Sequence, residues 1–511
     1  MCHVLREPGI LGEHNKIFRR KSKARESVSP RLLRQPDLTR MRAERNVSAL
    51  YFGSFFPSRN KRIPSGWECD MRILHLSFIA LLHLGTSVGV WAQCPPGVPP
   101  GTNCVAGVDE HGAFYLIGVP ANYNGRLVLW EHGYTLTPPA PLGAADLGVG
   151  LVALTQGFAA AASSFRPDAI GLSGWQVRDA AEDTENLRQR FVQLVGRPHK
   201  TYIVGGSEGG LITAETIERF ARDGEGRLNY DGALPLCGPV AGGDANWCGG
   251  FDLRTVYQYY CQNLPRAGEM QYPLYFGLPL GNMLTPQDVA ARVNECTGVL
   301  QPAATRTAQQ ARNLANILGV EKLPESFLII DMEFVTFGLQ EVTLVRTNGL
   351  SPVTNVGVKY RGSDDDAALN AGVFRAGFNP GAIAWLNSAY NPTGDVEIPT
   401  ITVHTIGDGL VIVENEHEYR EEFTEEHDRR KLFQLYTNAG GHCEFSNSEL
   451  AAAFEALVNW VEKKQRPTKE GVIAACAQFQ AVFGDTCKIN PTFRPGEFEA
   501  RVPARNAPGQ P

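Results

Sequence analysis

The chain alternates short apolar runs with amphipathic segments from about residue 113 to residue 237. The apolar runs predict strands at 113–120, 126–131, 157–163, 202–204 and 230–237. Between them, residues 177–196 place Leu187, Phe191 and Leu194 on one face of a helix. A helix also follows the run at 202–204. Strands that alternate with helices predict a mostly parallel sheet wound on both faces, an α/β fold.

This alternation stops between residues 238 and 396. Thr285 and Pro286 have the residue types of a helix N-cap and first position, which predicts a helix to about residue 296. A second helix is predicted at 304–318, and a third apolar stretch lies at 327–345. The segment therefore predicts a largely helical cap inserted into the sheet domain.

The alternating pattern returns after the cap. Strands are predicted at 398–405 and 431–436, and helices at 414–423 and 447–464. The predicted sheet domain is thus made of two parts, residues 93–237 and 397–465. Residues 466–511 form a C-terminal tail in this interpretation.

The first 92 residues have a different composition. Residues 1–70 are rich in Arg and Ser without an apolar period, which predicts a disordered or spurious extension. Residues 71–92 begin with Met71, carry one positive charge and an apolar stretch, and end in Val-Trp-Ala. This pattern predicts a signal peptide cleaved after Ala92 and a secreted or periplasmic protein that begins at Gln93. The alternative is a basic tail with a membrane anchor, but the apolar run is short for a spanning helix.

Charge and composition narrow the possible partners. The net charge of the chain is −6, although the first 70 residues are basic, so the predicted folded part is more acidic than the whole. That balance disfavours binding to nucleic acid or to an anionic membrane. We expect no stable membrane anchor, and the sequence leaves the oligomeric state open.

Nine of the eleven cysteines follow residue 92, in agreement with export to an oxidising compartment. None of them forms the C-x-x-C pattern of zinc or redox sites. Cys94 with Cys104 and Cys476 with Cys487 are close in sequence, and each pair is predicted to form a disulfide.

Candidate chemistry centres on Gly205-Gly-Ser207-Glu-Gly209, between a predicted strand and a predicted helix. The G-x-S-x-G spacing in that context is typical of a nucleophile elbow, in which a serine stands on a sharp turn. Glycines two residues before and after it avoid clashes with the neighbouring backbone. The alternative is an ordinary Gly-Ser turn before a helix.

Two later loops can supply a base and an acid. The last predicted strand runs into Gly441-His442, and the strand before it runs into Gly407-Asp408. Parallel strands bring both loops to the edge of the sheet that carries Ser207. The predicted triad is Ser207, Asp408 and His442, in the Ser-Asp-His order of one serine-triad fold. Asp395 and Glu414 are the alternatives to Asp408.

An oxyanion hole can form from backbone N–H groups at the same edge. The residue after the nucleophile is Glu208, and Gly133 and Tyr134 follow an earlier strand. Their N–H groups are the predicted donors, at Glu208 and at Tyr134 or Gly133. Whether the Glu208 side chain touches substrate stays open.

Other polar residues have simpler interpretations. His404 lies within a strand and is predicted to be a core histidine rather than the base. The run 364–366 of three aspartates is predicted to begin a solvated helix rather than to bind a cation. No cofactor and no metal is predicted.

Cys443 follows the predicted base directly, and Cys237 ends the strand after the elbow helix. Both should lie at the active edge of the sheet, so a disulfide between them is predicted to fix the histidine loop. The alternative partners lie in the cap, at Cys248, Cys261 and Cys296.

With these motifs the chain resembles the α/β-hydrolase superfamily, and within it the secreted bacterial serine hydrolases of the esterase and peptidase type. The resemblance implies that Ser207 is the nucleophile, His442 the base and Asp408 its orienting acid. His442-Cys443 is also similar to the tannase and feruloyl esterase enzymes, whose cysteines beside the serine and the histidine are bridged. Here Gly206, not cysteine, precedes the serine.

The prediction is a secreted serine hydrolase that cleaves a small-molecule carboxylic ester. A prolyl-type peptidase on the same fold is the first alternative, and it should show a carboxylate pair that holds a free amine or a propeller domain. A non-catalytic binding protein is the second alternative, and loss of a triad member would support it. No member is missing from the sequence.

Overall fold

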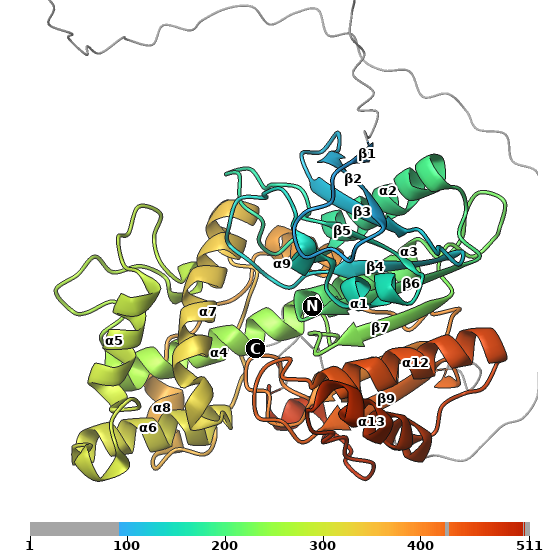
Figure 1. Ribbon diagram of the computed structural model, residues 1–511. Helices are drawn as coiled ribbons and strands as arrows, with labels where there is room; N and C mark the ends of the chain where they lie inside the picture. Colours follow the sequence, from blue (N-terminus) through green and yellow to red (C-terminus); the bar gives the residue numbers. More distant parts are fainter. Residues whose placement is uncertain (1–90, 425–428, 504, 506–511) are drawn as a thin grey trace, which may run out of the picture. The chain divides into compact units, whose positions relative to one another are not determined.

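The computed structural model describes residues 91–424, 429–503 and 505 (Figure 1). The predicted extension at 1–70 lies outside these residues. So does the predicted signal peptide, except for its last two residues, Trp91 and Ala92. Within the described ranges, no helix has the length and apolar character needed to cross a bilayer.

Nine strands of the described residues form one sheet in the order β1-β2-β3-β5-β4-β6-β7-β8-β9. The strands from β5 to β9 are parallel, and β1, β2 and β3 add an antiparallel edge. Their bounds are β1 Trp91–Ala92, β2 Thr102–Val108, β3 Phe114–Pro120, β4 Arg126–Glu131, β5 Ala159–Ser163, β6 Lys200–Gly206, β7 Gly232–Leu236, β8 Thr400–Thr405 and β9 Leu432–Thr437.

Helices cover both faces of this sheet because its strands are apolar on both sides. In β6, Ile203 packs on one face, with helices α2, α3 and α10, whereas Tyr202 and Val204 pack on the other, with α1, α12 and α13. The bounds are α1 Val149–Thr155, α2 Val177–Val195, α3 Glu208–Arg219, α10 Asn415–Glu422, α12 Asn447–Lys463 and α13 Lys469–Phe483.

A mostly helical insertion separates β7 from β8 and has its own apolar core, built around Trp247, Phe251 and Met332. Helix α4 leads from the sheet toward the cap helices α5, α6, α7 and α8, which lie at the left of Figure 1. The bounds are α4 Gly243–Cys261, α5 Pro286–Thr297, α6 Ala308–Glu321, α7 Leu328–Gln340, the π-helix η5 Glu341–Arg346, α8 Asp366–Gly372 and α9 Pro380–Ala389. Short 3-10 turns occur at η1 Ala144–Leu147, η2 Leu274–Phe276, η3 Ala303–Thr305, η4 Glu325–Phe327 and η6 Phe498–Ala500.

The fold class predicted from the sequence is confirmed: a mostly parallel, doubly wound sheet carries a largely helical insertion. Thr285 caps α5 as predicted, because its side chain accepts a hydrogen bond from the Asp288 N–H. The sequence pattern did not predict β1, β2 or α1, and the range 466–511 was predicted to be a C-terminal tail. That range contains α13, which packs against the sheet with α12. Its apolar face needed a neighbour that only the folded sheet supplies.

Candidate active site

Ser207 stands between β6 and α3 in a backbone conformation that non-glycine residues rarely adopt. Its φ is 59° and its ψ is −128°. The turn is held from outside, since the Ser207 N–H donates to the Leu236 carbonyl of the neighbouring strand at 2.9 Å. This geometry presents the hydroxyl at the carboxyl end of the sheet, as predicted for a nucleophile elbow.

The glycines around Ser207 are required by close backbone contacts. A Cβ at Gly205 would lie 2.1 Å from the Gly209 carbonyl oxygen, and one at Gly209 would lie 2.2 Å from the carbonyl oxygen of Glu131. No side chain fits at either position, so the spacing read in the sequence follows from the packing of the elbow against β4.

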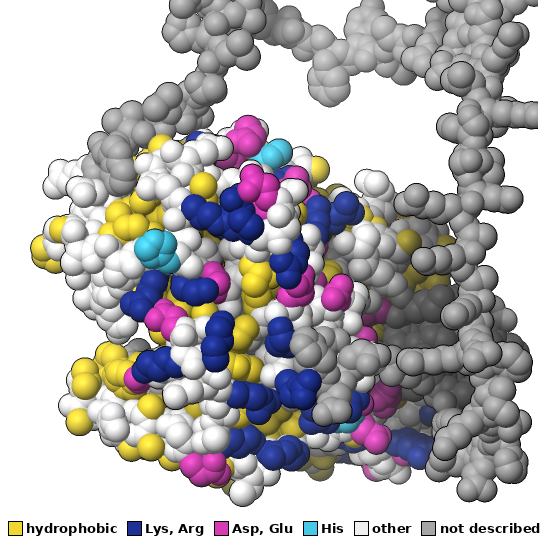
Figure 2. Space-filling view, turned by 90° about the vertical axis from the view of Figure 1, so that its right-hand side faces the viewer, with side chains coloured by type: hydrophobic (Ala, Val, Ile, Leu, Met, Phe, Trp, Pro, Cys, Tyr) yellow, Lys and Arg dark blue, Asp and Glu magenta, His cyan; other side chains and the backbone are white. Residues whose placement is uncertain are grey.

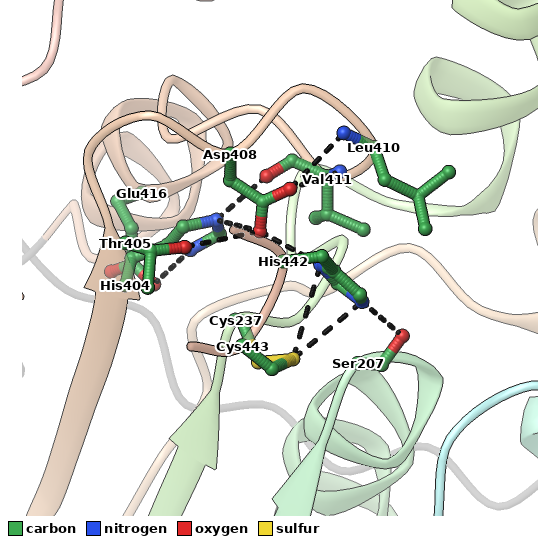
Figure 3. Close-up of a disulfide and its surroundings, with 10 residues drawn as sticks. All are labelled: Ser207, Cys237, His404, Thr405, Asp408, Leu410, Val411, Glu416, His442 and Cys443. Carbon is green, nitrogen blue, oxygen red and sulfur yellow. Dashed lines mark hydrogen bonds and ion pairs between the residues drawn. A yellow bond between two sulfur atoms is a disulfide. The ribbon is translucent and has the colours of Figure 1, made fainter. Parts of the chain in front are cut away.

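Ser207, His442 and Asp408 form a continuous chain of hydrogen bonds (Figure 3). The Ser207 Oγ lies 2.8 Å from His442 Nε2, and His442 Nδ1 lies 2.7 Å from Asp408 Oδ2. The three side chains come from loops after β6, β9 and β8, which are parallel. They therefore meet at one edge although they are far apart in the sequence.

Asp408 is buried and held by its own loop. Its Oδ1 accepts from the N–H groups of Leu410 at 3.1 Å and Val411 at 3.0 Å. Its Oδ2 also accepts from the Thr405 hydroxyl at 3.3 Å. These donors fix the carboxylate so that one oxygen faces His442.

His404 is a fully buried core histidine, as predicted. Its Nε2 lies 2.8 Å from the Val411 carbonyl, and its Nδ1 lies 3.4 Å from Glu416. Burial opposes the charged form of His404, but the Glu416 and Asp408 carboxylates outweigh it, and the pKa of His404 is raised. Neither ring nitrogen is directed at the serine.

The predicted disulfide between Cys237 and Cys443 is present, with 5.4 Å between the two Cα atoms. It joins the end of β7 to the loop that carries His442, and the Cys443 sulfur lies 3.5 Å from His442 Nε2. The predicted pairs Cys94–Cys104 and Cys476–Cys487 are also present, and a further disulfide joins Cys261 to Cys296 in the cap.

Gly133 and Glu208, two of the three residues predicted to supply oxyanion donors, lie beside Ser207. A Cβ at Gly133 would be 3.0 Å from the Ser207 Cβ and 3.5 Å from its Oγ, so this loop approaches the hydroxyl closely. Glu208 is the first residue of α3, and its N–H has no partner inside the helix. Helix starts of this kind favour developing negative charge.

The Glu208 side chain is directed into the protein interior. It is 3% exposed, and its Oε1 accepts from the Gln176 N–H at 3.0 Å. Burial raises the pKa of Glu208 to about 8, and the nearby Glu341 carboxylate adds to the rise. A neutral carboxyl beside Ser207 does not repel negative charge that develops there.

The cap reaches this edge through Tyr134. The ring packs edge-on against Trp247 of α4 and Phe334 of α7, and its hydroxyl donates to Glu341 at 3.4 Å. Glu341 begins the π-helix η5, and it pairs with Arg346 at the end of the same turn. The wider π turn brings residues five apart onto one face.

Sequence reasoning missed Glu341 and Arg346. In an ordinary α-helix, residues five apart point away from each other, so the sequence carries no signal for their contact. The N–H donors of Leu410 and Val411 were missed as well, because a backbone contact leaves no mark on residue type.

The remaining candidates lie away from the triad contacts. Glu414 faces Arg501, with 3.4 Å between the charged groups. Neither it nor Asp395 bonds to His442 in the described residues. Asp365 caps helix α8, as predicted for a helix start. Among the residues described, no three His, Cys, Asp or Glu side chains form a group that could hold a metal ion.

No family model and no curated protein matches this chain. Solved structures do. An esterase from Pyrococcus furiosus is similar with a TM-score of 0.37 and 13% identity, over 74% of this chain and 96% of the other. Feruloyl esterase B from Aspergillus oryzae is similar with a TM-score of 0.38 and 14% identity, over 74% of this chain and 86% of the other. Tannin acyl hydrolase from Aspergillus niger has a TM-score of 0.36 and 12% identity, over 72% of this chain and 79% of the other. At these scores the likeness carries no argument, so the residue roles rest on the contacts described above.

Proposed function

We propose that this protein is a serine hydrolase that cleaves carboxylic esters through an acyl-enzyme intermediate. The observation that carries the proposal is the hydrogen-bond chain from Ser207 through His442 to Asp408, at 2.8 and 2.7 Å. A serine hydroxyl is a weak nucleophile unless a neighbouring base removes its proton. The His442 Nε2 is within reach to do so.

The reaction follows from these contacts. His442 takes the proton of Ser207 as the oxygen attacks the ester carbonyl, and the imidazolium then gives the proton to the leaving alcohol. Asp408 stabilises the imidazolium and keeps Nε2 directed at the serine. Water attacks the acyl-enzyme by the same route in reverse, which releases the acid and restores Ser207.

The negative oxygen of the tetrahedral intermediate is held by backbone donors. The N–H of Glu208 and that of Tyr134 or Gly133 are the proposed pair. Preorganised donors of this type contribute about 10²–10³-fold each to kcat. The strained conformation of Ser207 supports the assignment, because strain of that kind persists where a side chain must be held in a special position.

The peptidase alternative predicts a carboxylate pair for a free amine. The cap does contain Glu321 and Asp331 beside a cavity of about 90 Å³, and each has a carboxylate oxygen without a described hydrogen-bond partner. Burial raises the pKa of both carboxyls well above its ordinary value, and Arg501, which lines the same cavity, only partly opposes the rise. We therefore propose an ester as the substrate, and the substrate panel below includes peptides.

Export to an oxidising compartment is part of the proposal. The four disulfides between described cysteines support it, since such bonds persist mainly outside the reducing cytosol. N-terminal sequencing of the exported protein tests it, and the expected first residue is Gln93. A mature chain that kept residues before Met71 would contradict both the start and the cleavage site.

A fluorophosphonate probe tests the central step because it labels only activated serines. We expect one label on Ser207 and none in Ser207→Ala. A panel of p-nitrophenyl esters and of peptides with free and blocked amines then separates the two activities. Turnover of free-amine peptides but of no ester would replace the esterase proposal with the peptidase. Absence of labelling and of turnover would favour a binding protein.

A further inference from the structure

A groove beside the edge strand β9 gathers more positive than negative charge from the residues that the structure describes. Its volume is about 340 Å³, and the charged residues among its described lining are Arg420, Arg429, Arg466, Lys469, Arg494 and Glu421. Figure 2 shows many Lys and Arg side chains on one side of the molecule, with apolar side chains and some Asp and Glu side chains between them. The chain as a whole has a net charge of −6, so this local excess of positive charge has the opposite sign to the net charge of the protein.

Arg466 is held in place by aromatic rings and carbonyl oxygens. Its guanidinium lies 5.4 Å from the centre of the Phe433 ring and 5.5 Å from that of Trp460. It donates to the carbonyls of Leu432 at 2.7 Å and Arg430 at 3.3 Å. None of these described contacts is with a carboxylate. A fixed guanidinium loses little freedom when it binds a planar or tetrahedral oxyanion.

Lys469 and Arg494 are arranged in the same way. The Lys469 ammonium donates to the Pro491 carbonyl at 3.1 Å and lies 5.5 Å from the centre of the Tyr436 ring. Arg494 donates to the Phe493 carbonyl at 2.7 Å. Burial lowers the pKa of Lys469, and the charge of Arg494 adds to this effect. Among the described residues, no carboxylate pairs with Arg466, Lys469 or Arg494.

The hydroxyl of Tyr436 adds a neutral donor to the lining. The side chain is 1% exposed, and its oxygen has no described hydrogen-bond partner. Burial raises the pKa of Tyr436 well above its ordinary value, so the hydroxyl keeps its proton at neutral pH. A buried hydroxyl without a partner is costly unless a ligand accepts its hydrogen bond.

We propose that this groove binds a ligand through a sulfate, phosphate or carboxylate group, which Arg466, Lys469 and Arg494 hold together with the Tyr436 hydroxyl. An oxyanion offers several acceptor oxygens and a negative charge that can pair with the three cations, for which the described residues supply no carboxylate partner. A groove of this volume fits a small molecule better than a polymer, and the acidity of the protein disfavours nucleic acid. The proposal uses no residue of the triad and is independent of the hydrolase assignment.

Calorimetric titration of the full chain at low ionic strength tests this site. The probes are inorganic phosphate, sodium sulfate and sodium acetate, each compared with sodium chloride at equal ionic strength. We expect one or more of the three oxyanions to bind saturably at a single site, and the preferred probe identifies the anionic group. Binding no better than that of chloride would overturn the proposal.

Four variants locate the site. Lys469→Gln and Arg494→Gln should each weaken binding about tenfold. Tyr436→Phe should weaken it several-fold while leaving the thermal midpoint of the free protein unchanged or higher, because the lost hydroxyl has no described partner. The control is Arg312→Gln, an exposed cap arginine that pairs with Asp364. If the control lowered affinity as much as the groove variants did, binding would be non-specific and the site refuted.

Discussion

The edge of the sheet and the cap both contribute polar groups near Ser207, but they fix these groups by different means. At the sheet edge the backbone sets the positions: three parallel strands end there, the elbow holds Ser207 at φ 59°, and a disulfide ties the His442 loop to β7. In the cap the positions depend on side chains. Glu341 and Arg346 share a π turn and reach the sheet edge through Tyr134.

This difference suggests a division of labour. Groups positioned by a rigid backbone suit bond-making steps, which tolerate little misplacement. Groups positioned by side-chain networks on an insertion can change without disturbing the sheet. Substitutions at the sheet edge should therefore lower kcat, and substitutions in the cap network should act mainly on KM.

The strongest test of the sheet edge is removal of the proposed nucleophile, Ser207, or of the proposed base, His442. Ser207→Ala should abolish fluorophosphonate labelling, and His442→Ala should lower kcat about as much, by around 10⁶-fold, since the two act as a unit. Steady-state kinetics on a p-nitrophenyl ester measure both. Activity in Ser207→Ala would show that Ser207 is not the nucleophile and would refute the proposed triad.

The orienting acid should matter less than the base. Asp408→Asn should lower kcat by about 10⁴-fold with little change in KM, because the imidazole stays in place but loses its correct tautomer. Asp395→Asn is the matched control and should keep near-normal activity. The reverse result in these two variants would move the acid to Asp395.

The disulfides allow the two regions to be compared by stability. Replacing Cys237 and Cys443 by serine should cost about 2–5 kcal/mol of the free energy of unfolding. Their loop spans 206 residues, against 35 for Cys261–Cys296 in the cap. The chain-entropy argument makes the cap pair less costly to remove by on the order of 1.5 kcal/mol. Urea unfolding of both double variants measures the difference, and an equal or larger loss from the cap pair would reject it.

The cap network should affect substrate binding modestly. Glu341→Gln weakens the contacts to Arg346 and to Tyr134, so we expect kcat/KM to fall about tenfold, chiefly through KM. Arg312→Gln serves again as the control in the cap, away from this network. A loss confined to kcat would show that the network belongs to the bond-making machinery after all.

The last test concerns pH. The pKa of Glu208 is raised to about 8 in the folded protein, above the ordinary value of 4.5, so the folded state holds a proton that the unfolded state has released. The stability contributed by the neutral carboxyl is present in full below about pH 4.5 and is lost as pH rises toward 8. Glu208→Gln should flatten part of this decline in unfolding experiments at pH 5, 6.5 and 8. An unchanged slope would mean that Glu208 does not titrate in this range.

Much of the sheet edge could be read from the sequence because its determinants are local. Gly205 and Gly209 are fixed by contacts within a few residues and one neighbouring strand, and the glycine-rich loops that carry Asp408 and His442 each follow an apolar run. Parallel strands then bring these loops together without further information. The disulfide at Cys443 followed from the same placement.

The cap and the outer edge of the sheet were decided by tertiary structure. The sequence does not predict the π turn that brings Glu341 and Arg346 together. Its hydrogen bonds join residues five apart, whereas those of an α-helix join residues four apart. The direction of the Glu208 side chain into the interior depends on the Gln176 N–H, which lies 32 residues earlier in the chain. Helix α13 and the groove beside β9 exist because the end of the chain packs back onto the sheet and there gathers Arg466, Lys469 and Arg494. The spacing of neighbouring residues can be read directly from the sequence. Contacts between distant segments depend on shape and burial, which exist only once the chain has folded.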